Sequence, residues 1–125
     1  MRLEEMEHPM DLLAAKARAR RAEAGAARHE AEGYREVARA CRERCVALRD
    51  SAAADEALVL EQGSTRLAAF AQGDARRALT QANLYETQAL RYDKFAERAI
   101  AEAGRAEAEA DTALTKAGRE ATTVQ

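Results

Sequence analysis

The thiol and imidazole side chains of this sequence, which are common ligands of zinc, are Cys41, Cys45, His8 and His29. The two cysteines lie four residues apart, a spacing that places both thiols on one face of a helix. They could supply two ligands to a zinc ion, but a structural zinc site needs four. Along a rigid helix, both histidines lie too far away to complete the set. We therefore interpret Cys41 and Cys45 as small residues in a helix–helix contact, with a metal- or redox-responsive module as a minor alternative.

The sequence contains no motif that predicts catalysis or cofactor binding. It lacks a glycine-rich phosphate loop and any arrangement of Ser, His and Asp beyond chance. Residues 65–125 carry nine basic and nine acidic side chains, and the net charge of the chain is −2, so no basic field indicates a nucleic acid as partner. We expect a non-enzymatic protein with no catalytic, cofactor or metal residues, whose partners are proteins.

Neither a secretory signal nor a membrane span is predicted. The first ten residues, MRLEEMEHPM, are acidic and lack the apolar segment of a signal peptide. No run approaches the ~20 apolar residues that a transmembrane helix needs. We therefore expect a soluble, cytoplasmic protein without membrane insertion.

The composition favours long helices over a thick globular core. Hydrophobic residues make up 47% of the chain, but 33 of its 125 residues are alanine, whose burial removes little apolar area. There is no Trp and only one Pro, and 34% of the residues are charged. This profile is typical of a coiled coil or a long helix.

Apolar residues recur in alternating steps of four and three through the first half of the chain, which is the spacing of a coiled-coil seam. Arg20 is the one polar residue of this stripe, and the pattern stops at Asp55. The predicted seam positions are Met6, Met10, Leu13, Ala17, Arg20, Ala24, Ala27, Ala31, Tyr34, Ala38, Cys41, Cys45, Leu48 and Ala52.

A second stripe with the same spacing runs through the other half of the chain without a polar residue. An unbroken series of this length is unlikely by chance even in an alanine-rich sequence, so it predicts a second helical seam. Its positions are Ala68, Ala71, Ala75, Ala78, Ala82, Tyr85, Ala89, Tyr92, Ala96, Ala99, Ala103, Ala106, Ala110, Ala113 and Ala117.

A Gly63-Ser64-Thr65 cluster lies between the stripes and predicts where the chain reverses. Glycine commonly ends a helix, and Ser or Thr commonly caps the next one. A reversal at Gly63 gives two arms of equal length, 9–62 and 65–118. Equal arms allow an antiparallel pair to cover its own apolar stripe.

We predict an all-α fold, an elongated antiparallel two-helix coiled-coil hairpin with an alanine-rich seam. It would form a single domain over residues 1–125, with frayed ends at 1–8 and 119–125. A looser tip within 51–65 is the alternative, because the first stripe stops after Ala52.

Three of the five aromatic rings lie between residues 83 and 99. With the reversal at Gly63, Tyr34 faces Tyr92 and Tyr85 faces Cys41. Rings set into an alanine seam would add burial and determine the register. The predicted structural seam residues are therefore Tyr34, Tyr85, Tyr92, Cys41, Cys45 and Leu48.

Other large apolar residues of the second half lie off the seam. In a lone hairpin they would be partly exposed, so either they wrap the flank of the seam or a partner covers them. Three of them, Leu67, Phe70 and Phe95, are candidate partner-binding residues. The remainder are Leu79, Leu84, Leu90, Ile100 and Leu114.

A basic cluster near the start of the chain is the other candidate partner-binding site. It consists of Lys16, Arg18, Arg20 and Arg21, with acidic residues of the second arm roughly opposite. Most such clusters are solvated or form ion pairs between helices. The alternative is a docking patch for an acidic protein.

The segment QALRYDKFAERAIAEAGRAEAEADTALTKAG, residues 88–118, resembles the C-terminal arm of the FliJ/YscO family of type III secretion stalk proteins, flagellar or injectisome. The similar elements are a Gln and a Tyr before an "AERA" segment, then a charged alanine helix closing on Leu114 and Gly118. The stretch GSTRLAAFAQ is also placed like the start of that family's returning helix. The resemblance covers about half of the chain.

This resemblance implies a coiled-coil stalk that binds a hexameric export ATPase and an export gate protein, and also export chaperones. The basic cluster and the helix over 105–119 would face the ATPase ring, and Leu67 and Phe70 would lie at the gate-facing end. The alternative is a homo-oligomeric helical-bundle scaffold or adaptor unrelated to secretion, with a homodimer burying the off-seam residues.

Overall fold

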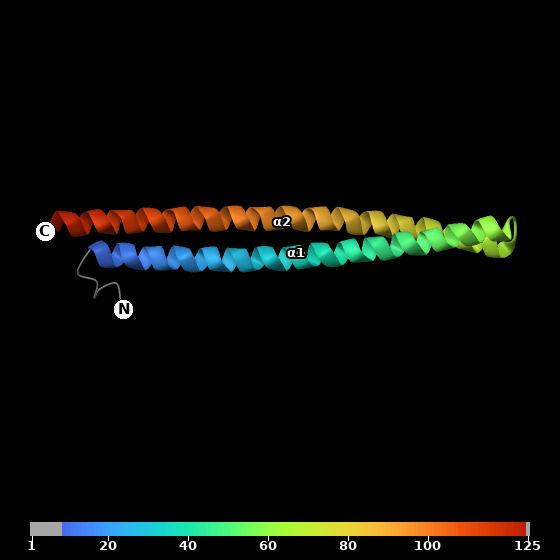
Figure 1. Ribbon diagram of the computed structural model, residues 1–125, viewed down its shortest axis with the longest axis horizontal. Coiled ribbons are helices and arrows are strands. Elements are labelled where there is room, and N and C mark those ends of the chain that lie inside the picture. Colours follow the sequence, from blue (N-terminus) through green and yellow to red (C-terminus); the bar gives the residue numbers. More distant parts are fainter. Residues whose placement is uncertain (1–8, 125) are drawn as a thin grey trace. The chain divides into compact units, whose positions relative to one another are not determined.

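The computed structural model of the protein describes residues 9–124, which form two helices joined by a short turn (Figure 1). Helix α1 spans Pro9–Gln62 and helix α2 spans Arg66–Val124. The described residues contain no β-strand. The predicted all-α class and the predicted antiparallel pair of helices are therefore confirmed.

Helix α1 has the bounds of the predicted first arm, whereas α2 is longer than its predicted counterpart. The second arm was expected to end at Gly118 and to fray beyond it, but α2 continues to Val124. Gly118 does not end the helix, because among the described residues only Gly63 has the positive φ with which glycine terminates helices. A helical glycine costs about 1 kcal/mol relative to alanine without breaking the helix. The remaining residues that were predicted to fray, 1–8 and 125, lie outside the described range.

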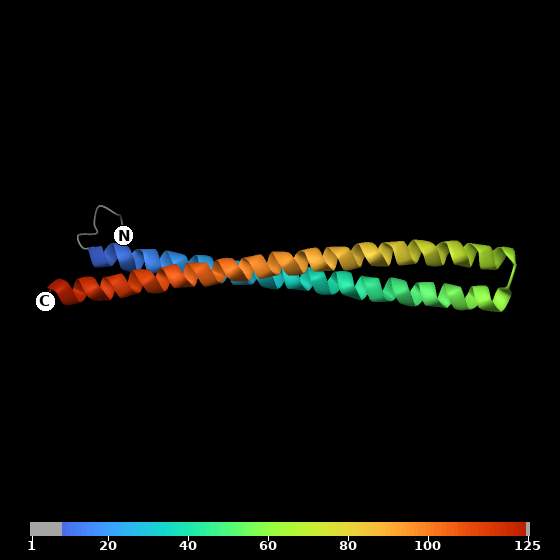
Figure 2. The ribbon, with the colours of Figure 1, turned by 90° about the horizontal axis from the view of Figure 1, so that it is seen from above.

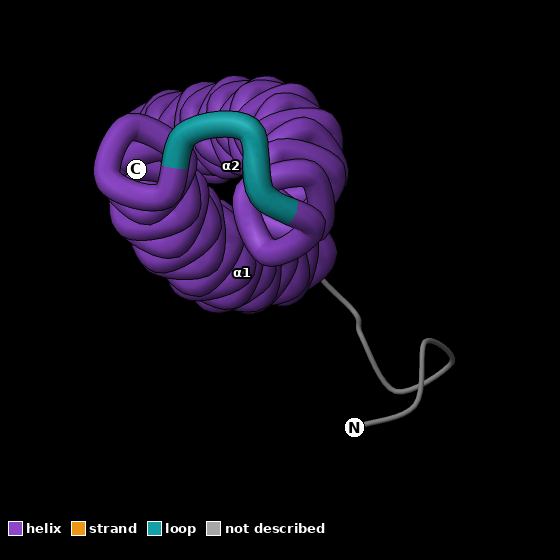
Figure 3. The backbone as a smooth tube through the Cα atoms, turned by 90° about the vertical axis from the view of Figure 1, so that its right-hand side faces the viewer, coloured by secondary structure: helices purple, strands orange, loops and turns teal. Residues whose placement is uncertain are grey.

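The reversal lies at residues 63–65, drawn in teal in Figure 3. Gly63 has a φ of 65° and donates its N–H to the carbonyl of Val59 at 3.0 Å, the bond that closes a helix in the left-handed capping motif. Thr65 then caps α2, because its Oγ1 accepts a hydrogen bond from the N–H of Ala68 at 3.2 Å. The alternative of a looser tip is wrong, since α1 stays helical to Gln62.

The core consists of small residues at the predicted seam positions. Every buried apolar residue of the described chain lies on one of the two predicted stripes, and apart from Cys41 and Cys45 all are alanines. The stripe of α1 also continues beyond Ala52, because Asp55, Val59 and Gln62 keep its spacing and are half-buried. Met6, a predicted seam position, lies outside the described residues.

The described residues divide into two compact units. The first, here called the turn unit, comprises residues 33–95 and is a helical hairpin in itself; its two segments lie side by side in both views (Figures 1 and 2). The second, here called the terminal unit, pairs residues 9–32 of α1 with residues 96–124 of α2.

The two units differ in the side chains that fill their seams. In the turn unit, larger residues pack against the alanines: Tyr85 and Tyr92 against the Ala38–Cys41–Ala89 cluster, and Leu48 against Ala52, Ala75 and Ala78. In the terminal unit, alanine packs on alanine, with Leu13 as the one larger residue in these clusters. The clusters of the terminal unit are Ala24, Ala27, Ala103 and Ala106, and Ala17, Ala110 and Ala113.

Candidate functional site

Cys41 and Cys45 are both free thiols buried in the seam of the turn unit. The Cys41 thiol lies 3.8 Å from Oε1 of Gln88 on the facing helix. Within residues 9–124, no group of three or more His, Cys, Asp or Glu side chains is placed to hold a metal ion. His29 is exposed, and His8 lies outside the described range. The placement of the cysteines as seam residues is confirmed.

Three aromatic rings form a cluster in the turn unit. The centroid of Tyr34 lies 6.1 Å from that of Tyr92 and 5.4 Å from that of Phe95, and Tyr92 meets Phe95 edge-on at 5.7 Å. The predicted pairing of Tyr34 with Tyr92 is confirmed. Phe95 is half-buried, so these two rings cover part of the side chain that was considered for a partner.

The fourth ring, Tyr85, also faces Cys41 as predicted. Its hydroxyl accepts a hydrogen bond of 3.2 Å from the guanidinium of Arg44, whose Cζ lies 5.5 Å from the ring centroid. Arg44 therefore packs over the rim of the seam instead of extending into solvent.

Ion pairs bridge the two helices along one flank of the turn unit. Arg42 pairs with Asp93, and Arg49 pairs with Glu86 at 2.6 Å. The hydrogen bond to the facing carboxylate raises the pKa of each arginine. All four side chains are at least one-third exposed, so these pairs align the helices more than they stabilise them.

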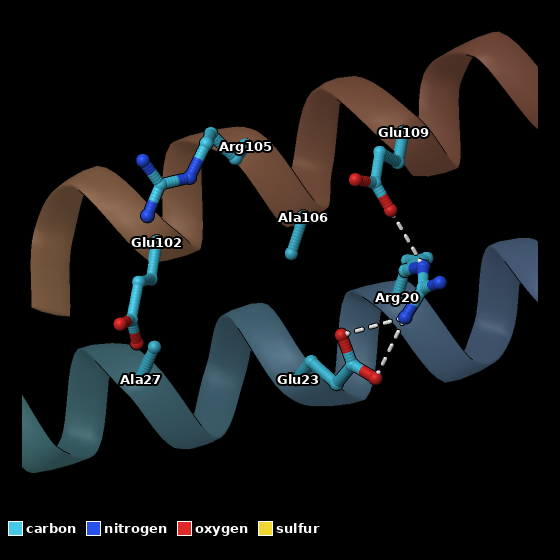
Figure 4. Close-up of a pocket in the computed structure, with 7 residues that line it drawn as sticks. All are labelled: Arg20, Glu23, Ala27, Glu102, Arg105, Ala106 and Glu109. Carbon is cyan, nitrogen blue, oxygen red and sulfur yellow. Dashed lines mark hydrogen bonds and ion pairs between the residues drawn. The ribbon is translucent and has the colours of Figure 1, made fainter.

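In the terminal unit, Arg20 forms ion pairs with one glutamate of each helix. Its Nη1 donates to both oxygens of Glu23 at 2.9 and 3.0 Å, and its Nε lies 2.7 Å from Glu109 as an ion pair without hydrogen-bond alignment (Figure 4). These side chains border an open groove of about 380 Å³ that Glu102 and Arg105 also line. Because charged side chains of both signs line it, this groove does not resemble an apolar ligand site.

The other basic residues of the predicted cluster do not gather on one face. Lys16 lines a groove with Leu13 and Lys116, whereas Arg18 and Arg21 lie on the other flank of α1 by their heptad positions. All three are exposed, and no ion pair to them is recorded among residues 9–124. The four residues therefore do not form one basic patch. Arg20 pairs with glutamates of the same chain, and the other three are exposed and lie apart on two flanks of α1.

Large apolar side chains outside the seam lie on two flanks of the turn unit. The heptad position of each residue shows on which flank it lies. With seam residues as a and d, positions c and g lie on one flank and positions b and e on the other. The c/g flank, here called the Phe70 face, has Phe70 at 65% exposure and Leu67 at 52%. Its large apolar residues are Val37, Leu58, Leu67, Phe70, Leu84 and Phe95, of which Leu58 and Phe95 are half-buried.

The opposite flank, here called the Leu60 face, carries two open grooves. One, of about 380 Å³, is lined by Leu60, Leu79 and the seam residues Val59 and Ala75, among others. The other, of about 260 Å³, lies over Cys45 between Val46 and Leu90. Leu60 is 87% exposed, the most of any large apolar side chain described. The large apolar residues of this face are Val46, Leu60, Leu79 and Leu90.

Sequence reasoning found part of these surfaces. The off-seam residues predicted in α2 are exposed, Phe95 excepted. The corresponding residues of α1, Val37, Val46 and Leu60, were not among the predicted off-seam residues. The same heptad count applied to α1 places Val37 at g and both Val46 and Leu60 at b, so that signal was present.

Comparison with known proteins gives no relative: no family model, no curated protein and no solved structure matches this chain.

No described helix combines the length and the apolar character that crossing a membrane requires.

Proposed function

We propose that the protein is a non-enzymatic adaptor that binds other proteins through the flanks of a helical hairpin. The observation that carries this proposal is the distribution of side-chain size in the turn unit. Small residues, alanine and cysteine, fill most of the seam, while Leu60, Phe70 and Leu84 remain outside it. Apolar patches of this kind on a small protein commonly mark interaction sites. The ion pairs Arg42–Asp93 and Arg49–Glu86 align the two helices that carry these surfaces.

The more specific proposal is a stalk of a type III protein export apparatus, binding the export ATPase and the export gate. It is supported by the resemblance of residues 88–118 to the FliJ/YscO arm and by the two-helix hairpin that the resemblance implies. We assign gate binding to the Leu60 face, because its two grooves combine exposed leucines with charged side chains at their borders. The exposed cations Lys16, Arg18 and Arg21 are assigned to the ATPase.

Capture of the two purified partners by the full chain tests this function. Replacing Leu60 and Leu79 with Ser should weaken gate binding about tenfold or more, since each removes an exposed apolar contact. Replacing Lys16, Arg18 and Arg21 with Glu should weaken ATPase binding and leave gate binding unchanged. The matched control is Leu67→Ser with Phe70→Ser, which removes two exposed large apolar side chains from the other face.

Failure of the wild-type chain to capture either partner would refute the export role. Loss of gate capture in the Leu67/Phe70 variant alone would instead return gate binding to the residues that the resemblance implies. The alternative function is a homo-oligomeric scaffold. One observation favours it: side-chain size and charge differ between α1 and α2 on the Phe70 face, so two copies of this face can complement each other.

A further inference from the structure

We propose that a second copy of this chain covers the Phe70 face, in a dimer whose two-fold axis runs parallel to the helices of the turn unit. This inference gives a specific geometry to the homo-oligomeric alternative and does not depend on the export role. It rests on two asymmetries between α1 and α2 on that face, one in side-chain size and one in charge.

The size asymmetry lies at the c positions of the heptads. On α1 the c positions from residue 33 to residue 54 carry only small residues, and all are exposed: Gly33, Ala40, Ala47 and Ala54. The next c position, beside the turn, carries Glu61. On α2 the same positions carry large side chains, also exposed: Phe70, Arg77, Leu84 and Arg91. The α1 half of the face therefore has a row of small side chains, and the α2 half has a row of large side chains that project from the helix.

The charge asymmetry lies along the outer border of the same face. On α1, the f positions next to the small row carry Glu36, Glu43 and Asp50. On α2, the basic residues of this region are Arg77 and Arg91 in the c row itself and Lys94 in the f row beside it. The structure records no ion pair for Glu36, Asp50 or Arg91 among residues 9–124, and Arg77 pairs only with Asp74 of its own helix.

These asymmetries select one arrangement of two copies. A two-fold axis parallel to the helices places α1 of one copy against α2 of the other. Small residues then meet large ones, and the acidic f row of α1 lies beside Arg77 and Arg91 of α2. A two-fold axis perpendicular to the helices, in the plane of the contact, would place α1 against α1, with both acidic rows together. Like charges facing one another disfavour association, so the parallel dimer is selected.

The parallel axis also determines the register, because it keeps each residue at the same height in both copies. Within one chain, Ala38 packs with Ala89 and Cys41 with Tyr85. The same count places Glu36 at the height of Arg91, and Asp50 at the height of Arg77. The two acidic residues therefore face the two arginines of the second copy without any adjustment of register.

The face is large enough for a stable contact. From Gly33 to Leu58 it is about 38 Å long at 1.5 Å per residue, and two helices of about 10 Å diameter make it about 20 Å wide. The product, roughly 760 Å², approaches the ~800 Å² per partner of a standard protein interface. Two helices from each copy would form a four-helix bundle, with the small and large c rows interdigitating between the hairpins.

Sedimentation of the 125-residue chain over a range of concentrations tests the dimer. We expect a reversible monomer–dimer equilibrium for the wild type. A chain with Glu36→Arg and Asp50→Arg, and a second chain with Arg77→Glu and Arg91→Glu, should each associate about tenfold or more weakly, because each homodimer then opposes like charges. Mixing the two chains should restore association, since the heterodimer regains every opposite-charge pair.

The matched control carries charge reversals on the Leu60 face, Arg39→Glu and Glu56→Arg, and should dimerise like the wild type. Circular dichroism of every variant checks that helicity is retained. Fluorescent labels on Ser64→Cys should lie close together in the dimer, because the parallel arrangement brings the two turns to the same end.

Three results would overturn the proposal: a wild-type chain that stays monomeric at every concentration, charge-reversed chains that dimerise as well as the wild type, or a mixture that does not recover. Distant turn labels in a stable dimer would also overturn it, because they would show an antiparallel contact. Gate capture that depends on Leu67 and Phe70 in a monomeric wild type would assign the face to that partner instead.

Discussion

At the scale of single residues, four rings provide apolar burial that alanine cannot. Most seam positions hold a side chain with one carbon, so Tyr34, Tyr85 and Tyr92 contribute more buried area than their neighbours. Phe95 belongs with them, because it contacts two of these rings from outside the seam. Individual residues of the turn unit thus differ widely in how much they contribute to its stability.

We expect Tyr92→Ala to lower the free energy of unfolding by about 1–3 kcal/mol, less than for a ring in a thick core, because a half-exposed seam can relax. Phe95→Ala should have a similar effect, since it removes two ring contacts. Urea denaturation measures both, and Leu84→Ala, at 61% exposure, is the control with a loss under about 0.5 kcal/mol. A loss for Phe95→Ala as small as the control would show that its ring contacts are not stabilising.

The second prediction at this scale concerns Glu107 of the terminal unit. Its hydrogen bond from Arg28 lowers the pKa of the carboxyl below its ordinary value. The pair therefore stabilises the fold above the unfolded-state pKa of Glu107, and this contribution is lost as the pH falls through the lower, folded-state pKa. Carboxyl chemical shifts followed by NMR should show Glu107 titrating at higher pH in Arg28→Gln than in the wild type. An unchanged midpoint would mean that the pair does not persist in solution.

At the scale of elements, three residues between the helices determine where the chain reverses. Gly63 alone carries a positive φ, and Thr65 supplies the cap that begins α2. Apart from its two chain neighbours, no atom lies within 4 Å of the position that an added Cβ would take at Gly63, so the requirement for glycine is conformational and not a matter of space. The turn is therefore specified locally, independently of the seam.

Gly63→Ala should lower the free energy of unfolding by about 1–2 kcal/mol, the cost of holding a residue with a Cβ in the left-handed conformation. Gly25→Ala is the matched control, because that glycine is helical and exposed, with no atom near the position of an added Cβ. We expect it to raise stability by about 0.5–1 kcal/mol. Thermal melts followed by circular dichroism measure both changes, and changes of the same sign would contradict this account of the turn.

Much of the helical architecture was predictable from the sequence, because coiled-coil spacing and glycine capping are local patterns. The stripes identified the buried residues, and Gly63 identified the turn. The extension to Val124 was not predictable, since a glycine such as Gly118 is compatible with either a helix end or a helix interior. The placement of Phe95 and the pairing of Arg20 with Glu109 depend on side-chain reach across the helices, which heptad positions do not report.

At the scale of the whole molecule, the two units have different cores. The turn unit contains the rings, both cysteines and Leu48, whereas the described clusters of the terminal unit contain alanine and Leu13. Larger buried side chains stabilise more, at roughly 25 cal/mol per Å² of apolar area. Local stability should therefore differ between the units even though both helices pass through each.

Amide hydrogen exchange under native conditions tests this difference. We expect amides in the middle of residues 33–95 to exchange more slowly than those in 9–32 and 96–124, because opening the turn unit exposes more apolar surface. The Tyr92→Ala chain is the control and should reduce the difference. Equal protection throughout would show that the chain opens only as one cooperative unit.

The alanine seam also has a consequence for how stability depends on temperature. The heat capacity increase on unfolding comes from newly exposed apolar surface, and typical domains show about 12–15 cal/mol/K per residue. Here the buried side chains are mostly single methyl groups. The heat capacity increment should therefore be below that range, which flattens the curve of free energy against temperature. Such a chain would lose little of its stability on cooling, and its cold-unfolding temperature would lie far below that of a protein with a thick core.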